Sequence, residues 1–146
     1  MENEQAKRLL KTLFKTQRLA VLATQGEQGP YTSLMAFAAS ADLTLLTFAT
    51  SRATRKYQNI ARNPAVALLI DDRSPERSRT HHAVTAAGKV KETSGEEAEY
   101  LRAAFLLKHP DLRDFLNCPD CALLKCSVDE YVIVTNFQDL FVYRPA

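Results

Sequence analysis

The stretch FATSRATRKYQNIARNP, residues 48–64, places positive charge and hydroxyl groups where a strand is expected to run into a short helix. Three cations fall in or near the first turn of that helix: Arg52, Arg55 and Lys56. The free backbone N–H groups of a helix start are already partly positive, so each added cation costs on the order of 0.3–1 kcal/mol. Ser51 and Thr54 contribute hydroxyl donors at the same place. Such a group of donors is typical of a phosphate-binding site, because a bound phosphate dianion reverses the sign of that cost.

Carboxylates are missing around this segment. Residues 43–70 contain no Asp or Glu, although the whole chain has 17, and an even distribution would place about three in such a window. A bound phosphate would compensate the cations of this stretch, which include Arg62 as well as the three above. The alternative is a basic surface helix whose cations pair with acids elsewhere, such as Asp71 or Asp72.

Three cysteines lie in the C-terminal part of the chain: Cys118, Cys121 and Cys126. Cys118-Pro-Asp-Cys121 has the spacing of a thiol redox pair or of half a zinc site. A zinc site needs four ligands, however, and only Cys126 is close by in sequence. A thioredoxin-like pair opens a helix within a βαβ unit, whereas here a turn at Pro119-Asp120 leads into an apolar strand. We therefore expect plain loop cysteines and no metal site, with redox or metal use as the alternative.

Composition limits the class of protein. The 146 residues are 46% hydrophobic and 25% charged, as in an ordinary globular protein, and we expect a single domain over residues 1–146. A net charge of +2 gives no argument for nucleic acid or a membrane surface, and no apolar run reaches the roughly 20 residues of a membrane span. The start, MENEQAKRLLKTLFK, lacks the basic-then-apolar order of a signal peptide, so we expect a cytoplasmic protein.

Periodicity predicts few helices and many strands. Residues 4–15 place apolar side chains on one helical face, residues 53–62 form the short helix, and Ser94-Gly-Glu-Glu97 fits a capping box that opens a helix at about 95–108. Strands are expected at Leu19–Thr24, Tyr31–Ala38, Leu43–Thr50, Ala65–Ile70, Ala83–Thr93, Ala122–Ser127, Tyr131–Thr135 and Leu140–Tyr143. This order without βαβ alternation favours an antiparallel sheet closed into a small barrel with peripheral helices.

The motif around the short helix, Thr50-x3-Thr54-Arg55-Lys56 followed by Asn63-Pro64, is similar to the FMN phosphate segment of the pyridoxamine 5′-phosphate oxidase-like split barrels. With the strands before and after it, the resemblance covers roughly residues 18–93. It implies a mainly β fold with peripheral α-helices, a six-stranded antiparallel split β-barrel of Greek-key type. It also implies a homodimer with FMN held at the subunit interface.

The same resemblance implies two groups of cofactor-binding residues. The phosphate and ribityl chain are expected to lie against the loop and the helix start, on Thr50, Ser51, Arg52, Thr54, Arg55 and Lys56. The strand segment Ser33, Leu34 and Met35 is expected to lie against the isoalloxazine and to give backbone hydrogen bonds to its pyrimidine edge.

This chain departs from the oxidases proper at several positions. Ser33 stands where they carry an arginine that binds the phosphate, and Arg52 could compensate from the other side. Ala36-Phe37-Ala38 lacks a lysine that ends that strand, His82-Ala83 replaces a glutamine that touches flavin, and the C-terminus lacks an Arg-x-His motif. We therefore do not expect pyridoxamine phosphate oxidase activity.

The sequence thus predicts an FMN-binding oxidoreductase that moves hydride or electrons between a reduced donor such as NAD(P)H and an unidentified acceptor. The cofactor carries the chemistry, so no catalytic side chain is expected. Arg73, Arg77 and Arg79 could receive a second anionic substrate or could form a solvated loop. Two alternatives stay open: a non-catalytic FMN carrier, sensor or electron-transfer module, and a split barrel that binds haem through His81 or His82.

Assembly is the last expectation from the sequence. An apolar barrel face that bears Val66, Leu68 and Ile70, or their neighbours, needs a cover. We expect a C2 homodimer in which the second subunit closes the FMN site.

Overall fold

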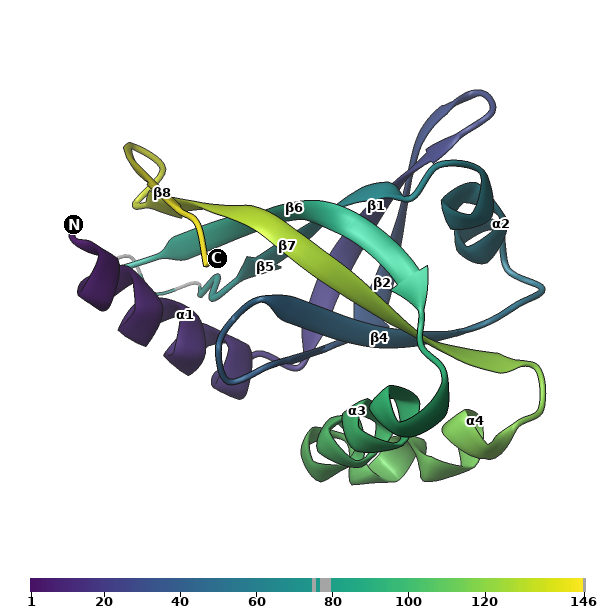
Figure 1. Cartoon of the computed structure of the whole chain (residues 1–146). Coiled ribbons are helices and arrows are strands. Elements are labelled where there is room, and N and C mark those ends of the chain that lie inside the picture. The colour runs from purple at the N-terminus through teal and green to yellow at the C-terminus, as the bar shows by residue number, and fades with distance from the viewer. Residues whose placement is uncertain (75, 77–79, 146) are drawn as a thin grey trace.

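A computed structural model describes residues 1–74, 76 and 80–145, and Figure 1 shows its elements. The helices are α1 (Asn3–Thr16), α2 (Arg55–Arg62), α3 (Gly95–Lys108) and α4 (Arg113–Asn117), with a 3-10 turn η1 (Pro110–Leu112) before the last. The strands are β1 (Leu19–Gly26), β2 (Gly29–Ala36), β3 (Ala38–Ala39), β4 (Leu45–Ser51), β5 (Ala65–Asp71), β6 (His82–Glu92), β7 (Cys121–Thr135) and β8 (Asp139–Tyr143).

All strands belong to one antiparallel sheet, in the order β2-β1-β5-β6-β7-β4-β3, with β8 paired to β7. The sheet curls so far that β2, at one end of this order, contacts β4 near the other end. β2 and β4 are not paired by backbone hydrogen bonds along this path, so the barrel stays open between them. The predicted split barrel is confirmed, and this opening is its split.

The predicted six strands correspond to the six that have seven or more residues: β1, β2, β4, β5, β6 and β7. Two short strands, β3 and β8, bring the total of described strands to eight. Residues 122–127 and 131–135, expected as two strands, form the single long strand β7, which pairs with three neighbours along its 15 residues.

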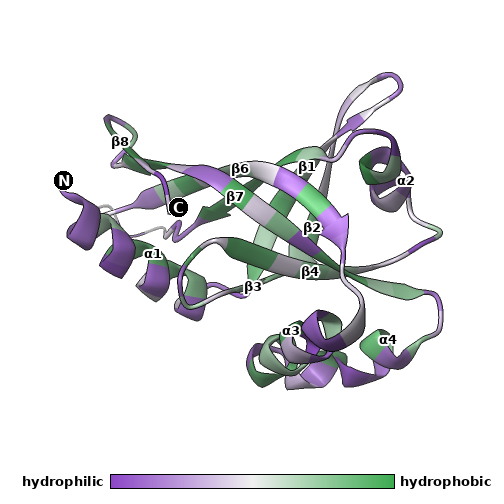
Figure 2. Cartoon of the chain, in the orientation of Figure 1, coloured by the Kyte–Doolittle hydropathy of each residue, from purple (hydrophilic) through white to green (hydrophobic). Residues whose placement is uncertain are grey.

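Alternation along the strands fills the inside of the barrel. Leu22, Leu68, Ile70 and Ile133 are fully buried there, and the Tyr131 hydroxyl donates to the Leu43 carbonyl at 2.6 Å. α1 packs its apolar face, including Phe14, on one end of this core. The side of α1 that faces the viewer in Figure 2 is mainly hydrophilic. No helix in the described part of the chain is long and apolar enough to cross a membrane.

The expectation about the packing surface is wrong for the three residues that it names. Val66, Leu68 and Ile70 do not form an outer apolar face, because they point into the barrel core and are at most 8% exposed. The expectation also allowed for their neighbours, and Leu69 of β5 is exposed, as are Leu19 of β1 and Leu34 of β2. Side chains of β5 alternate between the two faces of the sheet, as expected for a strand. The face that bears Val66, Leu68 and Ile70, however, is the inner face, which the barrel core covers and not a partner subunit.

The helices α1, α2 and α3 lie close to their predicted ranges, but the capping box predicted for α3 is absent. Ser94 is the N-cap of α3, and its side chain makes no capping hydrogen bond, so the predicted capping box does not form. A capping box does form at α1, between Glu2 and Gln5. The α4 helix was not expected. It is five residues long and buries only Leu116, so its sequence carries almost no periodic signal.

Candidate functional site

The split between β2 and β4 opens into a groove of about 480 Å³, within the range of small-molecule and cofactor sites. Its lining is mainly apolar, with a polar part made by the start of α2 and the residues before it: Arg18, Leu19, Leu34, Met35, Ala36, Ala49, Thr50, Ser51, Thr54, Lys56, Phe105, Leu112 and Phe115. Six of the nine residues predicted to bind a cofactor line this groove: Leu34, Met35, Thr50, Ser51, Thr54 and Lys56. The other three, Ser33, Arg52 and Arg55, lie outside its lining.

The polar part of the groove is the start of α2. Thr54 is the N-cap, and its Oγ1 accepts a hydrogen bond from the backbone N–H of Tyr57 at 3.4 Å. The hydroxyl of Thr54 also donates to the carbonyl of Ser51 at 2.8 Å and lies 2.9 Å from that of Thr50. These contacts hold the β4–α2 loop in one shape and direct the first turn of α2 toward the split.

Two of the four cations on this segment are neutralised by the protein. Arg52 pairs with Glu92 at 2.7 Å, and Arg62 pairs with Glu27. Neither Arg55 nor Lys56 forms an ion pair with a carboxylate of the residues that the structure describes. The alternative of a merely paired basic helix therefore accounts for Arg52 and Arg62, although Asp71 and Asp72 are not the partners.

Arg52 has a structural role at the end of the loop. Its guanidinium donates to Glu92 and to the carbonyls of Pro119 and Cys121, at 3.2 and 3.3 Å. Glu92 also accepts from the Tyr57 hydroxyl at 2.7 Å. The hydrogen bonds from Arg52 and then Tyr57 lower the pKa of the Glu92 carboxyl, so it stays ionised. The network ties α2 to β6 and holds Arg52 away from the groove.

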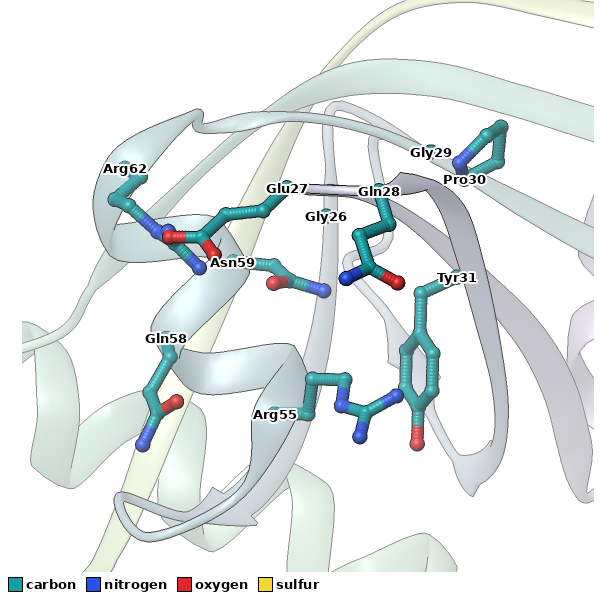
Figure 3. A pocket seen from close by; sticks show the side chains of 10 residues that line it. All are labelled: Gly26, Glu27, Gln28, Gly29, Pro30, Tyr31, Arg55, Gln58, Asn59 and Arg62. Atoms are coloured by element: carbon teal, nitrogen blue, oxygen red, sulfur yellow. The ribbon is translucent and has the colours of Figure 1, made fainter.

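Arg55 faces a second hollow, of about 360 Å³, between α2 and the β1–β2 hairpin (Figure 3). Its guanidinium lies 5.0 Å from the centre of the Tyr31 ring, a cation–π contact at one end of that hollow. The Arg62–Glu27 pair lies at the other end. Adjacent residues Arg55 and Lys56 thus present their charges to two hollows, on either side of the helix start.

Ser33 does not replace the arginine that the oxidases carry. Its Oγ is buried and has no hydrogen-bond partner among the described residues, and the side chain is not part of the groove lining. The neighbouring Leu34 and Met35 do line the groove, on a strand whose other edge pairs with β1. The backbone hydrogen bonds that the sequence predicts for Ser33 stay a prediction.

The apolar wall of the groove comes from a segment that sequence reasoning did not connect with the site. Phe105 of α3, Leu112 of η1 and Phe115 of α4 line the groove, and Phe105 packs near Ala36 of β2 and Ala49 of β4. Buried Phe105 and Leu116 pack together with Ala38 as a separate small core. In the sequence, only the apolar content of residues 101–116 points to this role. That content does not indicate which strands these residues pack against.

His109 fixes this wall to the strand beside the groove. The side chain is fully buried, and its Nε2 lies 2.7 Å from the carbonyl oxygen of Phe37, just after β2. Its Nδ1 has no partner among the described residues. Burial lowers the pKa of His109, and the nearby Lys108 and Arg18 lower it further, so the ring is held neutral. A neutral imidazole here donates from Nε2 to Phe37.

The histidines considered for haem lie elsewhere. His82 is held by Asp72, which contacts its Nδ1 at 2.8 Å, and the His81 ring lies 6.3 Å from the ring of Phe137. Both line a hollow of about 220 Å³, below the usual size of a cofactor site. Arg73 lines the same hollow and pairs with Asp71, whereas Arg77 and Arg79 lie outside the described residues. Among the residues described, no group of three or more His, Cys, Asp and Glu could hold a metal ion.

Comparison with solved structures supports the fold. The chain is 20% identical to a haem-binding protein from Mycobacterium smegmatis, with a TM-score of 0.84, covering 96% of this chain and 58% of that one. It is 20% identical to General Stress Protein 26 from Bacillus anthracis, with a TM-score of 0.70 and coverages of 96% and 98%. An FAD-binding protein from Mesorhizobium loti is 17% identical, with a TM-score of 0.72 and coverages of 88% and 91%.

Sequence comparison gives the family. No curated protein matches the chain significantly. The sequence profile of pyridoxamine 5′-phosphate oxidase, however, matches residues 6–117, which include both edges of the split, the start of α2 and the apolar wall. A match over that much of the chain, with the split barrel it implies, makes this protein a member of the pyridoxamine 5′-phosphate oxidase family.

Proposed function

We propose that this protein is an FMN-binding oxidoreductase of the cytoplasm that moves hydride or electrons between a reduced donor such as NAD(P)H and an acceptor. The observation that carries the proposal is the groove in the split, whose lining combines apolar side chains with the hydroxyls and the lysine at the start of α2. Flavin mononucleotide has a planar ring at one end and a phosphate dianion at the other.

The residues present fit this cofactor. Leu34, Phe105 and Phe115 offer apolar surface to a ring, and the edge of β2 offers backbone groups to its polar rim. Thr50, Ser51 and Thr54 offer hydroxyls, and Lys56 offers a charge that no described carboxylate neutralises. Arg55, on the other side of the helix start, can approach the same phosphate by rotating away from the ring of Tyr31.

The protein acts by binding and orientation. When bound, FMN supplies the redox chemistry, and the chain supplies position, electrostatics and exclusion of water. The start of α2 with Lys56 holds the anionic end, since a helix N-terminus attracts phosphate. The apolar wall from α3 to α4 keeps water from one side of the ring. Among the described groove residues, none is placed as a general acid or base, so proton exchange would involve solvent or substrate.

The fit of the groove is tested by the absorption spectrum of the freshly purified full chain and by titration with FMN. The proposal predicts the bands of oxidised flavin and their bleaching by NADH or NADPH under nitrogen. Binding of FMN without bleaching by either donor would favour a non-catalytic carrier, sensor or electron-transfer module instead. Failure to bind FMN would contradict both.

Haem binding is the second candidate, and one observation favours it: the solved haem-binding protein from Mycobacterium smegmatis shares the fold. The size of the hollow at His81 and His82 argues against a haem there. A Soret band after titration with hemin, lost in His81→Ala or His82→Ala, would support haem over flavin. We expect no such band.

A further inference from the structure

Cys118 and Cys121 are already arranged as the ends of one tight turn. The backbone N–H of Cys121 donates to the carbonyl of Cys118 at 3.0 Å, which closes a four-residue turn with Pro119 and Asp120 in its centre. Such a hydrogen-bonded turn keeps its end Cα atoms within about 7 Å, and disulfides bridge Cα atoms that are about 4.4–6.8 Å apart. Proline at the second position holds the turn in shape without the disulfide.

Cys118 and Cys121 are not joined by a disulfide in the structure, and each thiol makes only weak contacts. Cys118 is exposed, and its Sγ lies 3.5 Å from the carbonyl oxygen of Asp114. Cys121 is half-buried, with its Sγ 3.9 Å from the carbonyl oxygen of Ala122. A thiol is a weak hydrogen-bond donor, so rotating the two side chains toward each other gives up little. Cys126, by contrast, is fully buried in the barrel core.

The turn contacts the loop that forms the polar part of the groove. The carboxylate of Asp120 accepts from the Ser51 hydroxyl at 2.5 Å, and its carbonyl accepts from the backbone N–H of Arg52 at 2.9 Å. The guanidinium of Arg52 donates to the carbonyls of Pro119 and Cys121. Three consecutive residues of the turn are therefore bonded to residues 51 and 52, the start of the loop that ends at the N-cap of α2.

We propose that Cys118 and Cys121 form a redox-active dithiol, which exchanges with a small-molecule disulfide and transmits its oxidation state to the loop at residues 51–54. The second half of this proposal rests on the proposed function, and the first half does not. A dithiol that oxidises transiently is the usual form of disulfide chemistry in a reducing compartment.

The reaction is a two-step exchange. The thiolate of exposed Cys118 attacks one sulfur of the small disulfide, forms a mixed disulfide and releases one thiolate. The thiolate of Cys121 then attacks the Cys118 sulfur and releases the second. Two cysteine thiols are oxidised to one disulfide, the small disulfide is reduced to two thiols, and both protons pass to the released thiolates.

Oxidation is expected to weaken the hydrogen bonds between the turn and the loop at residues 51–54, and with them the binding of FMN. A disulfide brings the two Cβ atoms to about 3.8 Å, which tightens the turn and moves Asp120 relative to Ser51 and Arg52. The contacts at 2.5–3.3 Å belong to the dithiol form, so this movement loosens them. We expect FMN to bind about three- to tenfold more weakly to the oxidised protein.

The first test needs no cofactor. The full chain, reduced with dithiothreitol, is equilibrated in glutathione buffers of increasing oxidised fraction, and its free thiols are alkylated and located by mass spectrometry. The proposal predicts a disulfide between Cys118 and Cys121 that reverses on reduction, with Cys126 still alkylated after denaturation. A lasting mixed disulfide with glutathione, or no oxidation at all, would overturn it.

The second test measures FMN affinity by fluorescence in both redox states. Cys118→Ser and Cys121→Ser should bind FMN like the reduced wild type under every condition, while Cys126→Ala, the matched control, should keep the redox response. Asp120→Ala removes only the contact with the Ser51 hydroxyl, so this variant should still form the disulfide and should show a smaller difference in affinity. An oxidised wild type that binds FMN as tightly as the reduced one overturns the transmission but leaves the disulfide standing. Failure of the proposed function would instead appear as no FMN binding in either state.

Discussion

At the scale of residues, the adjacent cations Arg55 and Lys56 decide how tightly an anionic cofactor is held. Neither is paired with a described carboxylate, and they approach the start of α2 from opposite sides. A charge-assisted hydrogen bond is worth roughly 1.5–3 kcal/mol. A cation at a helix start destabilises the fold slightly. We therefore expect these two charges to contribute to the binding of the cofactor phosphate.

Replacing both with alanine, R55A/K56A, is expected to remove on the order of 3–6 kcal/mol of binding energy, about two to four decades in FMN affinity. Riboflavin lacks the phosphate and should bind the wild type with a similar loss. The two losses should not add, because they remove one interaction from its two sides. The dissociation constants of FMN and of riboflavin are measured by titration of the wild type and of the double variant.

Arg62→Ala is the matched control, because Arg62 lies on the same helix but is paired with Glu27 at its far end. It should leave FMN affinity near that of the wild type. If the double variant still prefers FMN over riboflavin by about a hundredfold, the phosphate lies elsewhere.

His109 makes the stability of the fold depend on pH. Burial lowers its pKa from the usual 6.5, so the unfolded chain binds more protons than the folded one as the pH falls below 6.5. Stability should be complete above pH 6.5 and should decrease as the pH drops toward the folded-state pKa. Protonation of Nδ1 would bury a donor that has no partner among the described residues.

Urea unfolding of wild type and His109→Gln between pH 7.5 and 5.5 measures this effect. The glutamine variant should be less stable at pH 7.5 by about 1–3 kcal/mol but should lose less stability over that range. His81→Gln is the matched control, because its ring lies outside the core. Equal pH dependence in wild type and His109→Gln would assign the effect to other groups.

At the scale of elements, the pairing of β6 with β7 depends on a residue without a side chain. The register of this pair shifts between Ala87 and Gly88, and a Cβ added at Gly88 would lie 2.2 Å from the carbonyl oxygen of Ser127. No rotamer relieves a clash with backbone. β7 also pairs with β4, so a displacement here is passed toward the split.

Gly88→Ala is therefore expected to destabilise the protein by about 3 kcal/mol, measured by thermal or urea unfolding. Gly95→Ala provides the contrast. Its added Cβ would meet nothing within 4 Å, but its φ of +63° strains an L-residue by about 1–2 kcal/mol. A Gly88 variant no less stable than the Gly95 variant would contradict the close approach of β6 and β7.

At the scale of the whole molecule, three of the exposed apolar side chains lie at the split. Leu34 is 66% exposed, Leu19 is 44% and Phe115 is 41%, and all three line the groove. An exposed apolar rim around a binding groove is typical of an interaction surface. We expect a second subunit to cover this rim, and not the face of β5 that bears Val66, because that face is already buried in the core.

We expect a C2 homodimer of twice 16.4 kDa by light scattering, with FMN enclosed between the subunits. Leu19→Glu and Leu34→Glu should shift the dimer to the monomer by burying a charge at the interface. Leu107→Glu should not, although Leu107 is 87% exposed, because it lies on a different groove beside α1. A monomer that binds FMN as tightly as the proposal requires would contradict this assembly.

The sequence by itself determined the local elements and the chemistry of one loop. The 3.6-residue period of α1, the apolar strands and the Thr54 cap are short-range patterns, and they are found where they were predicted, except that the last long strand, β7, was expected as two. The segment 50–56 was recognisable for the same reason. Its hydroxyls and cations are neighbours in sequence, so one turn of helix is enough to bring them together.

Only the tertiary structure decided what surrounds that loop. Arg52 pairs with Glu92, 40 residues away, and His109 reaches Phe37 across 72 residues, which no local pattern specifies. The apolar wall, the side of the sheet that is buried and the facing of Arg55 and Lys56 toward different hollows also depend on how the sheet curls. Curling is the sum of many small strand twists and long-range pairings, so it emerges only when the whole chain is folded.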